Sequence, residues 1–597
     1  MRTLCDLTSA TPWLDPAELR IGLGCMRLSS DGDRDEALAA QTIAAARDAG
    51  ITVFDTAHAY GRDETELGSG ERLLARALAG RGRAPAGCGR AATRARVITK
   101  GGMTRPGGGW VPDGRAKRIM ADCEASLAAL GGLPIDLYLI HAPDPRTPWP
   151  TSVRALARLL DEGMVARVGL SNVSRHQLDQ ALELVPVSAV EVALSVHDER
   201  ALRGGIVARC EELSIAVIAH SPLGGPRRAG GLARRAPLAE AARAASATPA
   251  EVALAWLLGL SPVLVAIPGA RRPETARSAA RAARLTLDPQ LAATLGSAPQ
   301  TRRARATTSP DLPGADADVV LIMGVPGAGK SRLAETYRQR GYVRLNRDER
   351  GGALQALADE LTAQLELGAR RVVLDNTYLT RAARSYVIEA AGRHGLAVRC
   401  VWLETPLAQA QVNMVERLLE RFGGLPSPED LRALARREPG ALAPTQQMRT
   451  FRELEPPSSD EGFAAVEVIP FTRAAAAETR TGVVVFVAAA ALAEANPHQP
   501  LAGVHPEAPH LVFDWRPDGS PADLAPLAAR LAARLVETAV CPHGAGPPRC
   551  WCRPPLPGLP LAFAHTHGLD PARCMLIGNS TAHRTLAAAL GARYVES

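Results

Sequence analysis

The first half of the sequence repeats one pattern eight times: a short apolar run followed by a longer segment with apolar residues at helical spacing. The runs occupy residues 20–25, 51–56, 96–100, 135–141, 167–172, 189–194, 216–221 and 263–269. Eight strands that alternate with helices over about 280 residues are typical of a closed (β/α)8 barrel. A doubly wound sheet is the alternative, but no Gly-x-Gly-x-x-Gly turn follows the first run. We therefore predict an α/β fold that begins with a TIM barrel.

Polar side chains follow several of these runs, where a barrel of this kind builds its site. They are Asp55, Lys100, His141, Asn172, His220 and Ser221. Lysine is rare in this chain. Of the 69 lysines and arginines, only three are lysines, namely Lys100, Lys117 and Lys330. A lysine in such a composition indicates a position where arginine cannot replace it. Lys117 is the exception and is interpreted as an exposed helix residue.

Two breaks divide the chain into three parts. The segment 299–316 loses apolar periodicity and gathers Pro, Thr, Arg and Asp, as linkers do. A second break follows near residues 472–481. We predict a barrel over 1–298, the linker 299–316, an α/β domain over 317–473 and a small α/β domain over 478–597.

Composition favours a soluble cytoplasmic protein. The net charge of +7 comes from 69 basic residues interspersed with 62 acidic ones, so only weak attraction to polyanions is expected. The N-terminus lacks an apolar signal core, and the longest apolar run, 483–493, is too short to span a bilayer. The ten cysteines are interpreted as reduced thiols with one metal site, not as a disulfide framework.

The residues at the second, third and fourth strand ends form a recognisable set. Asp55 and Tyr60 lie in FDTAHAYG, Lys100 ends the third strand and His141 the fourth. Together they resemble the catalytic tetrad of the aldo/keto reductase family, and the resemblance covers residues 18–290, with HAPDP, GLSN, SPLG and IPG after later strands. It implies reduction of a small-molecule aldehyde or ketone by NADPH.

The chemistry explains these residue types. A carbonyl that accepts hydride needs a proton, and a tyrosine hydroxyl is a poor donor near neutrality unless its pKa is tuned. A compact ammonium lowers that pKa, and a carboxylate keeps the ammonium charged. We therefore expect Tyr60 to be the general acid, Lys100 and Asp55 its tuning pair, and His141 a donor that orients the carbonyl.

The resemblance also implies the cofactor site. Ser171 and Asn172 would hold the nicotinamide amide, and Glu191 stands where the family often has glutamine. The pyrophosphate and 2′-phosphate of NADPH would meet a further set, namely Ser221, Leu223, Arg271 and Arg277. Ser278-Ala279 replaces the usual Glu-Asn near the adenine, so the choice between NADPH and NADH stays open.

The second part opens with a phosphate-binding loop. An apolar strand leads into GVPGAGKS, with Gly324, Gly327, Gly329, Lys330 and Ser331, and an amphipathic segment follows. Such loops cradle phosphates with backbone amides, while the lysine reaches the β- and γ-oxygens and the serine holds Mg²⁺. We predict ATP binding with Mg²⁺.

The segments that follow resemble the kinase domain of polynucleotide 5′-kinases over residues 318–472. The resemblance implies Asp348 as general base, with Arg347 beside it. It places Asp375, Asn376 and Thr377 at the next strand end, towards the acceptor. Asn413 and Arg417 match the lid, whose arginine stabilises charge on the transferred group. Small-molecule kinases share the same loop and a similar base, so the phosphoryl acceptor stays open between a nucleic-acid 5′ end and a small molecule.

The third part offers four metal ligands at close spacing: Cys541, His543, Cys550 and Cys552. Thiolates and imidazole in a set of four suit tetrahedral zinc. The loop resembles that of haloacid-dehalogenase-type (HAD-like) phosphatases of the heptose-bisphosphate and histidinol-phosphate group. The acidic residues that those phosphatases need are missing: VVVFVAAAALA replaces their Asp-x-Asp segment and Gly578-Asn579 their Gly-Asp. We predict an inactive HAD-like domain with a structural zinc.

The sequence thus predicts a multifunctional enzyme: an NADPH-dependent reductase fused to an ATP-dependent hydroxyl kinase. One alternative is a nucleic-acid end-processing or repair protein whose barrel is a binding or sensor module. A third interpretation is an ATP-regulated sensor that binds nicotinamide cofactor without turnover.

Overall fold

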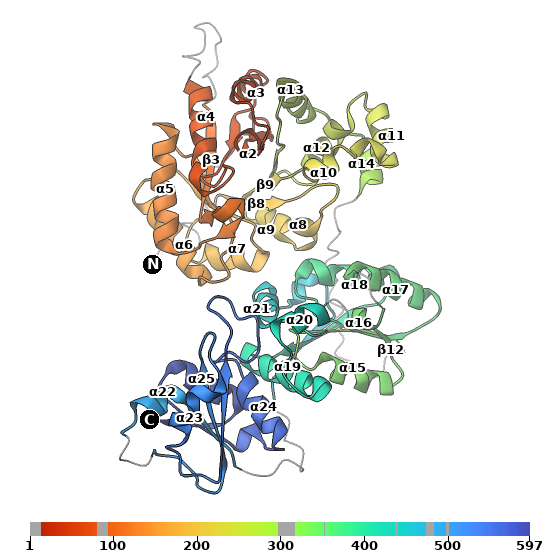
Figure 1. Cartoon of the computed structure of the whole chain (residues 1–597). Helices are drawn as coiled ribbons and strands as arrows, with labels where there is room; N and C mark the ends of the chain where they lie inside the picture. Colours follow the sequence, from red (N-terminus) through yellow and green to blue (C-terminus); the bar gives the residue numbers. More distant parts are fainter. Residues whose placement is uncertain are drawn as a thin grey trace. The chain divides into compact units, whose positions relative to one another are not determined.

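The computed structural model describes residues 13–79, 94–296, 317–350, 353–435, 440–472, 483–496 and 501–597. The predicted linker, 299–316, lies outside the described residues, as do residues 473–482 between the second and third predicted parts. The chain separates into two compact units, Met1–Gln300 and Thr301–Ser597 (Figure 1).

The first unit contains a closed parallel barrel of eight strands. In barrel order they are β1 (Gly22–Gly24), β2 (Val53–Asp55), β3 (Arg96–Gly101), β6 (Leu137–Ile140), β7 (Val168–Ser171), β8 (Ala189–Ala193), β9 (Ala216–His220) and β10 (Leu264–Ile267). A parallel bridge between Ile21 and Ala266 joins β1 to β10 and closes the sheet. All eight predicted strands are therefore confirmed.

Helices surround this barrel (Figure 1, red to yellow-green). The longer ones are α3 (Glu36–Asp48), α4 (Ser69–Ala79), α5 (Ala116–Leu130), α6 (Trp149–Asp161), α7 (Arg175–Leu182), α9 (Ile206–Glu212), α11 (Ala236–Ala244), α12 (Pro249–Gly259), α13 (Pro273–Ala282) and α14 (Pro289–Leu295). Most of them bury one apolar face against the barrel, whereas α12 is buried on all sides and α14 has no fully buried residue. Local sequence sets their ends: Thr248 and Glu251 form a reciprocal capping box at the start of α12.

Short helices and strands lie in the segments that connect the barrel strands and the longer helices. They are α2 (Met26–Ser30), α8 (Arg200–Arg203), α10 (Pro226–Ala229), η1 (Glu64–Glu66), η2 (Pro106–Gly108), η3 (Leu232–Arg234), β4 (Met103–Thr104) and β5 (Val111–Pro112). The antiparallel pair β4–β5 follows β3 directly and forms a small hairpin. This hairpin brings Trp110 to the site described below.

The second unit begins with a five-stranded parallel sheet in the order β12-β13-β11-β14-β15. The strands are β11 (Asp318–Met323), β12 (Val343–Leu345), β13 (Arg371–Asp375), β14 (Val398–Glu404) and β15 (Ala465–Pro470). The helices are α15 (Lys330–Gln339), α16 (Arg347–Arg350), α17 (Leu354–Glu366), α18 (Arg381–Arg393), α19 (Leu407–Phe422), α20 (Pro428–Leu434) and α21 (Pro444–Glu453), with η4 (Ser459–Glu461). We call this part the P-loop domain.

A second five-stranded parallel sheet follows in the order β18-β17-β16-β19-β20. Its strands are β16 (Val485–Ala488), β17 (Pro509–Trp515), β18 (Leu535–Cys541), β19 (Met575–Gly578) and β20 (Arg593–Glu596). The connecting elements are α22 (Ala489–Glu494), η5 (Pro521–Leu524), α23 (Ala525–Ala528), α24 (Gly558–Thr566), η6 (Pro571–Arg573) and α25 (Thr581–Leu590). We call this part the C-terminal domain.

The two sheets of the second unit share hydrophobic packing. One face of α19 is buried in the same apolar cluster as the C-terminal domain, so this cluster includes Met414 and Leu418 together with Trp551 and Leu586. The helix therefore belongs to the P-loop domain by sequence and supports both domains by packing. Among the described residues, no helix is both long and apolar enough to cross a bilayer.

Candidate functional sites

Lys100 is the centre of the barrel site. Its side chain is fully buried at the end of β3, and its ammonium donates to the carboxylate of Asp55. The ammonium also lies 3.3 Å from the hydroxyl oxygen of Tyr60 and 3.1 Å from the carbonyl oxygen of Thr56. The structure thus brings the predicted lysine, aspartate and tyrosine into direct contact.

Two aromatic side chains contact the ring of Tyr60. The His141 ring lies edge-on to Tyr60, with centroids 5.7 Å apart, and Trp110 stands edge-on to both at 6.2 and 5.8 Å. Trp110 keeps 44% of its surface exposed although it is apolar, and the guanidinium of Arg105 covers its ring at 3.7 Å. Trp110 was not predicted from the sequence, and the only signal is a bulky aromatic after three glycines next to the β3 end.

A cavity of about 290 Å³ opens above these groups. Among the predicted residues its wall includes Asp55, Tyr60, His141, Asn172, Glu191, Ser221 and Leu223. Its wall also includes Met26, Arg27, Trp110 and His220. Ser171 is buried behind this wall and its hydroxyl accepts from the Asn172 amide at 3.1 Å.

Two residues of the cavity wall have strained backbones. Asn172 and Ser221 adopt φ values of 57° and 50°, in the left-handed region that few residues other than glycine occupy. The Asn172 amide donates to the His141 carbonyl oxygen at 3.0 Å, and its side-chain oxygen lies 3.1 Å from the His220 ring. A strained backbone persists only where neighbouring residues hold its conformation, and strained residues are common at functional sites.

The predicted phosphate-binding arginines lie away from this cavity wall. Arg271 pairs with Asp33 at 3.0 Å and with Asp31 at 3.4 Å, on the segment after α2. Arg277 is exposed on α13. Their contact with a cofactor phosphate stays a prediction.

The phosphate-binding loop of the second unit lies between β11 and α15. Gly324, Gly327 and Gly329 all have positive φ, of 153°, 89° and 92°, which a side chain would oppose. Lys330 begins α15 and its ammonium donates to the carbonyl oxygens of Gly324 and Val325, both at 2.9 Å. The next residue, Ser331, is exposed at the same helix start.

A cavity of about 720 Å³ lies beside this loop. Its wall includes Gly327 and Gly329, the predicted lid residues Asn413 and Arg417 of α19, and the end of β15. Residues 570–572 of the C-terminal domain complete the wall, which the sequence did not predict. The Asn413 amide donates to the Gly327 carbonyl oxygen at 2.7 Å, so α19 holds the loop directly.

The predicted acceptor residues lie at the ends of β12 and β13. Asp348 and Arg347 are exposed on α16, where a large substrate can reach them. Asp375 is buried and pairs with Arg344 through two hydrogen bonds of 2.6 and 2.8 Å, so its carboxylate is already engaged. Asn376 is buried beside it, and Thr377 is partly exposed. Asn346, which was not predicted, donates to the Asp375 carbonyl oxygen and accepts from the Asp348 amide.

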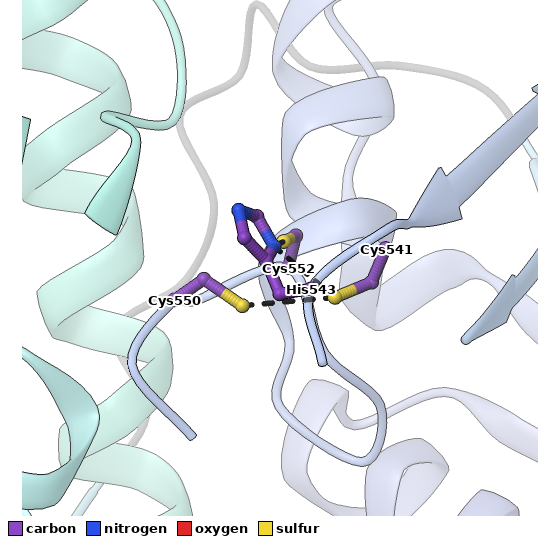
Figure 2. Close-up of side chains that lie close together, drawn as sticks. All are labelled: Cys541, His543, Cys550 and Cys552. Carbon is purple, nitrogen blue, oxygen red and sulfur yellow. Dashed lines mark hydrogen bonds between the residues drawn. The ribbon is translucent and has the colours of Figure 1, made fainter. Parts of the chain in front are cut away.

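The four predicted metal ligands lie together (Figure 2). One ligand atom from each of Cys541, His543, Cys550 and Cys552 lies within 4.8 Å of all the others. The Cys541 and Cys550 sulfurs are 3.6 Å apart, and the His543 Nδ1 atom is 3.3 Å from the Cys552 sulfur. With metal–sulfur bonds of about 2.3 Å, these separations match the edges of a tetrahedron around one ion.

Comparison with known proteins gives two family matches. The model of the aldo/keto reductase family matches residues 20–298. The barrel is an aldo/keto reductase domain. A second model, described as an AAA domain, matches residues 319–436, so the phosphate-binding loop belongs to a P-loop domain of that class.

Individual relatives match the reductase domain. An uncharacterized oxidoreductase of Schizosaccharomyces pombe is 28% identical over 283 residues, which cover 46% of this chain and 85% of the relative. Glycerol dehydrogenase from Gluconobacter oxydans is 25% identical, with a TM-score of 0.41 and coverage of 51% of this chain and 97% of that structure. An aldo/keto reductase from Klebsiella pneumoniae in complex with NADP and acetate is 26% identical, with a TM-score of 0.38 and coverage of 46% and 89%.

Burial and charge act in opposite directions on the Tyr60 hydroxyl of the reductase domain. Burial raises the pKa of Tyr60 above its usual value, and the neighbouring Lys100 lowers it as expected without cancelling the effect of burial. For Lys100, burial lowers the pKa, but Asp55 and Glu191 outweigh it and raise the pKa well above its usual value. The pKa of Tyr60 is thus raised overall and not lowered as predicted, because burial outweighs the charge of Lys100, and Tyr60 keeps its proton beside a charged lysine.

Glu191 adds a second carboxyl group to this cluster. Its Oε2 atom lies 3.2 Å from the Lys100 ammonium, and both side chains are buried. Burial and the charge of Glu191 raise the pKa of Asp55 to about 8, while Lys100 opposes the shift. With two carboxyl groups around one ammonium, the cluster is neutral when one carboxyl keeps its proton.

Acid is expected to destabilise the reductase domain through His141 and His220. Burial, then Lys100, lowers the pKa of His220 to about 4 and that of His141 well below its usual value. The unfolded chain binds these protons near pH 6.5, so the two histidines lower the free energy of unfolding as the pH drops from about 6.5 towards 4. Asp55, whose pKa is raised to about 8, acts in the opposite direction over this range and offsets part of the fall. Each proton contributes about 1.4 kcal/mol per pH unit. Pulse proteolysis of the barrel in urea at several pH values measures this slope. His220→Asn is expected to reduce it by one proton, and an unchanged slope would contradict the assignment.

Proposed function

We propose that this chain combines two enzymes: a reductase that converts an aldehyde or ketone to an alcohol with NADPH, and a kinase that transfers phosphate from ATP to a hydroxyl group. The observation that carries the first activity is the contact between Lys100, Asp55 and Tyr60 at the floor of a cavity. The observation that carries the second is the phosphate-binding loop, with Lys330 at its helix start.

In the reductase, the side chains supply everything except the hydride. NADPH provides the hydride when bound. Asn172 and Glu191 on the cavity wall, with Ser171 behind it, would hold its nicotinamide end, and Ser221 and Leu223 its pyrophosphate. Tyr60 donates its proton to the carbonyl oxygen as negative charge develops there. The Lys100 ammonium, held by Asp55, stabilises the phenolate that remains.

His141 orients the carbonyl in this scheme. Its lowered pKa keeps the ring neutral, so one ring nitrogen carries a hydrogen that can be donated. The Nδ1 atom is buried and has no hydrogen-bond partner among the described residues. Trp110 closes the other side of the space above Tyr60, so the carbonyl carbon lies in a cavity with an aromatic wall.

In the kinase, ATP would occupy the cavity beside the phosphate-binding loop. The loop that these glycines shape would hold the phosphates with its backbone amides, and Lys330, whose ammonium now donates to carbonyl oxygens of its own loop, would donate to them instead. Burial, then Arg417, lowers the pKa of Lys330 to about 8, and phosphate charge would restore its proton. Ser331 would hold Mg²⁺, Asp348 would accept the proton of the acceptor hydroxyl, and Arg417 would stabilise the transferred group.

The acceptor is proposed to be the 5′-hydroxyl of a polynucleotide, because Asp348 and Arg347 are exposed on an open surface. Labelled ATP with 5′-hydroxyl oligonucleotides, and in parallel with small alcohols, tests this choice. Transfer to oligonucleotides is expected. Transfer to small alcohols alone would replace the polynucleotide by a small-molecule acceptor, and Asp348→Asn should abolish either reaction.

The C-terminal domain is proposed to be an inactive HAD-like phosphatase with a structural zinc held by Cys541, His543, Cys550 and Cys552. Alanines follow β16 where a nucleophilic carboxylate would stand, and Asn579 follows β19. Asp514, at the end of β17, is paired with Arg516 at 2.9 Å. No phosphate release from a 3′-phosphorylated oligonucleotide is expected, and Mg²⁺-dependent release would overturn the proposal.

Lys100→Arg is expected to reduce carbonyl reduction by about a hundredfold or more while keeping the positive charge. Lys100 is fully buried between Asp55, Glu191 and Tyr60, and a broad guanidinium cannot hold the same contacts in that space. Steady-state NADPH oxidation with an aldehyde measures the loss, and Lys117→Arg on the exposed face of α5 is the matched control. An unchanged rate of NADPH oxidation in Lys100→Arg would show that this position does not require a lysine.

A further inference from the structure

Trp551 lies inside the metal loop and faces the P-loop domain. It stands between the ligands Cys550 and Cys552, and only 1% of its surface is exposed. Its indole N–H donates to the carbonyl oxygen of Leu442, at 2.9 Å, in the segment before α21. The largest side chain of the metal loop is thus hydrogen-bonded to the neighbouring domain.

The segment that accepts this hydrogen bond leads into α21, and α21 contacts the phosphate-binding loop. Leu442 precedes α21, and Gln447 in that helix is fully buried. The Gln447 amide donates to the Pro326 carbonyl oxygen within the loop at 2.8 Å, and to that of Ala410 in α19 at 3.0 Å. Only four residues of chain therefore lie between Leu442, which accepts the Trp551 hydrogen bond, and Gln447, which holds the loop.

Packing reinforces this connection. Trp551 belongs to the same apolar cluster as the buried face of α19, the helix that carries Asn413 and Arg417. A Cβ atom at Gly558 would lie 2.3 Å from the Trp551 carbonyl oxygen and 3.0 Å from Leu425, so no side chain fits between the metal loop and the P-loop domain here. The position of Trp551 is thus fixed on both sides.

We propose that metal binding by Cys541, His543, Cys550 and Cys552 sets the nucleotide affinity of the P-loop domain, with Trp551 as the positioning residue that transmits it. The ligands on either side of Trp551 fix its backbone when both hold one ion. Without the ion, the Gly- and Pro-rich loop between Cys541 and Cys550 regains conformational freedom, and the indole loses its fixed place. The inactive C-terminal domain would then act as a metal-dependent support for the kinase site. This inference rests on the proposed nucleotide binding.

The test uses the full chain and a fluorescent ATP analogue with Mg²⁺. Zinc is removed with a zinc-selective chelator, the chelator is dialysed away, and Zn²⁺ is added back while metal content is measured. Removal is expected to weaken nucleotide affinity by about fivefold or more, the scale of one buried hydrogen bond, and one Zn²⁺ per chain is expected to restore it. Nucleotide affinity that does not change with zinc content would overturn the inference.

Two variants separate this connection from a general loss of structure. Trp551→Phe removes the hydrogen bond to Leu442 and keeps an aromatic ring, so one zinc per chain with about fivefold weaker nucleotide binding is expected. Trp256→Phe is the matched control, because its indole donates to the Gly296 carbonyl oxygen at 2.9 Å within the other compact unit, so an equivalent hydrogen bond is lost without touching the metal loop. The control should leave nucleotide affinity unchanged. Equal affinities in zinc-loaded Trp551→Phe and wild type would overturn the role of Trp551, whereas failure of every form to bind nucleotide would refute the proposed kinase itself.

Discussion

Tyr60→Phe is expected to reduce the turnover of carbonyl reduction by about 10²- to 10⁴-fold, the range for loss of a general acid. The substitution removes one oxygen, 3.3 Å from the Lys100 ammonium, and leaves the ring that packs against His141 and Trp110. Because the aromatic wall stays, NADPH affinity should change little. Stopped-flow hydride transfer and cofactor titration by fluorescence measure the two effects separately.

The control for Tyr60→Phe is a tyrosine outside the cavity. Tyr138 is fully buried in β6, and its hydroxyl donates to the Ile119 carbonyl oxygen at 3.0 Å. Tyr138→Phe therefore removes an equivalent buried hydroxyl without touching the site, and should affect stability more than turnover. A full reductase rate in Tyr60→Phe would mean that the proton comes from another group.

Lys330→Ala is expected to abolish phosphoryl transfer and to weaken ATP binding. The lysine is the only one of the three in the chain that lies in the second unit, and it begins α15 at the loop that would hold the phosphates. Its loss also removes two hydrogen bonds to the loop carbonyls of Gly324 and Val325, so the loop should become less ordered. Transfer of labelled phosphate and titration with a fluorescent ATP analogue measure the effect.

Reductase activity in the same preparation is the internal control for Lys330→Ala, because the two sites belong to separate compact units. Lys117→Ala, on the exposed side of α5, controls for the loss of one positive charge. Phosphoryl transfer at the wild-type rate in Lys330→Ala would show that the loop does not hold the reacting phosphates.

The strands and the chemical residues at their ends were predictable, because both depend on local sequence. Apolar runs at regular spacing defined all eight barrel strands, and Lys100 was conspicuous in a chain that otherwise uses arginine. The phosphate-binding loop was predictable for the same reason: its glycines and its lysine are contiguous in sequence.

Contacts between distant segments were not predictable. The pair of Lys100 with Asp55 was predicted, but the contact of Lys100 with Glu191 was not, because Glu191 lies on a strand far from Lys100 in sequence. Arg344 pairs with Asp375 across the neighbouring strands β12 and β13. The sequence motifs around these residues do not define how the two strands align. The anchor from Trp551 to Leu442 crosses 109 residues, and nothing around Trp551 in the sequence indicates its partner.

The reductase domain is expected to perform carbonyl reduction with Tyr60 as its proton donor, independently of the P-loop domain. The most direct measurement compares NADPH oxidation by a panel of aldehydes and ketones in wild type, Tyr60→Phe and Lys330→Ala, all as full-length chains. We expect wild type and Lys330→Ala to reduce the same carbonyl compounds at equal rates and Tyr60→Phe to fall at least a hundredfold. Equal rates in wild type and Tyr60→Phe would show that Tyr60 is not the proton donor, and loss of reduction in Lys330→Ala alone would show that the reductase depends on the P-loop domain.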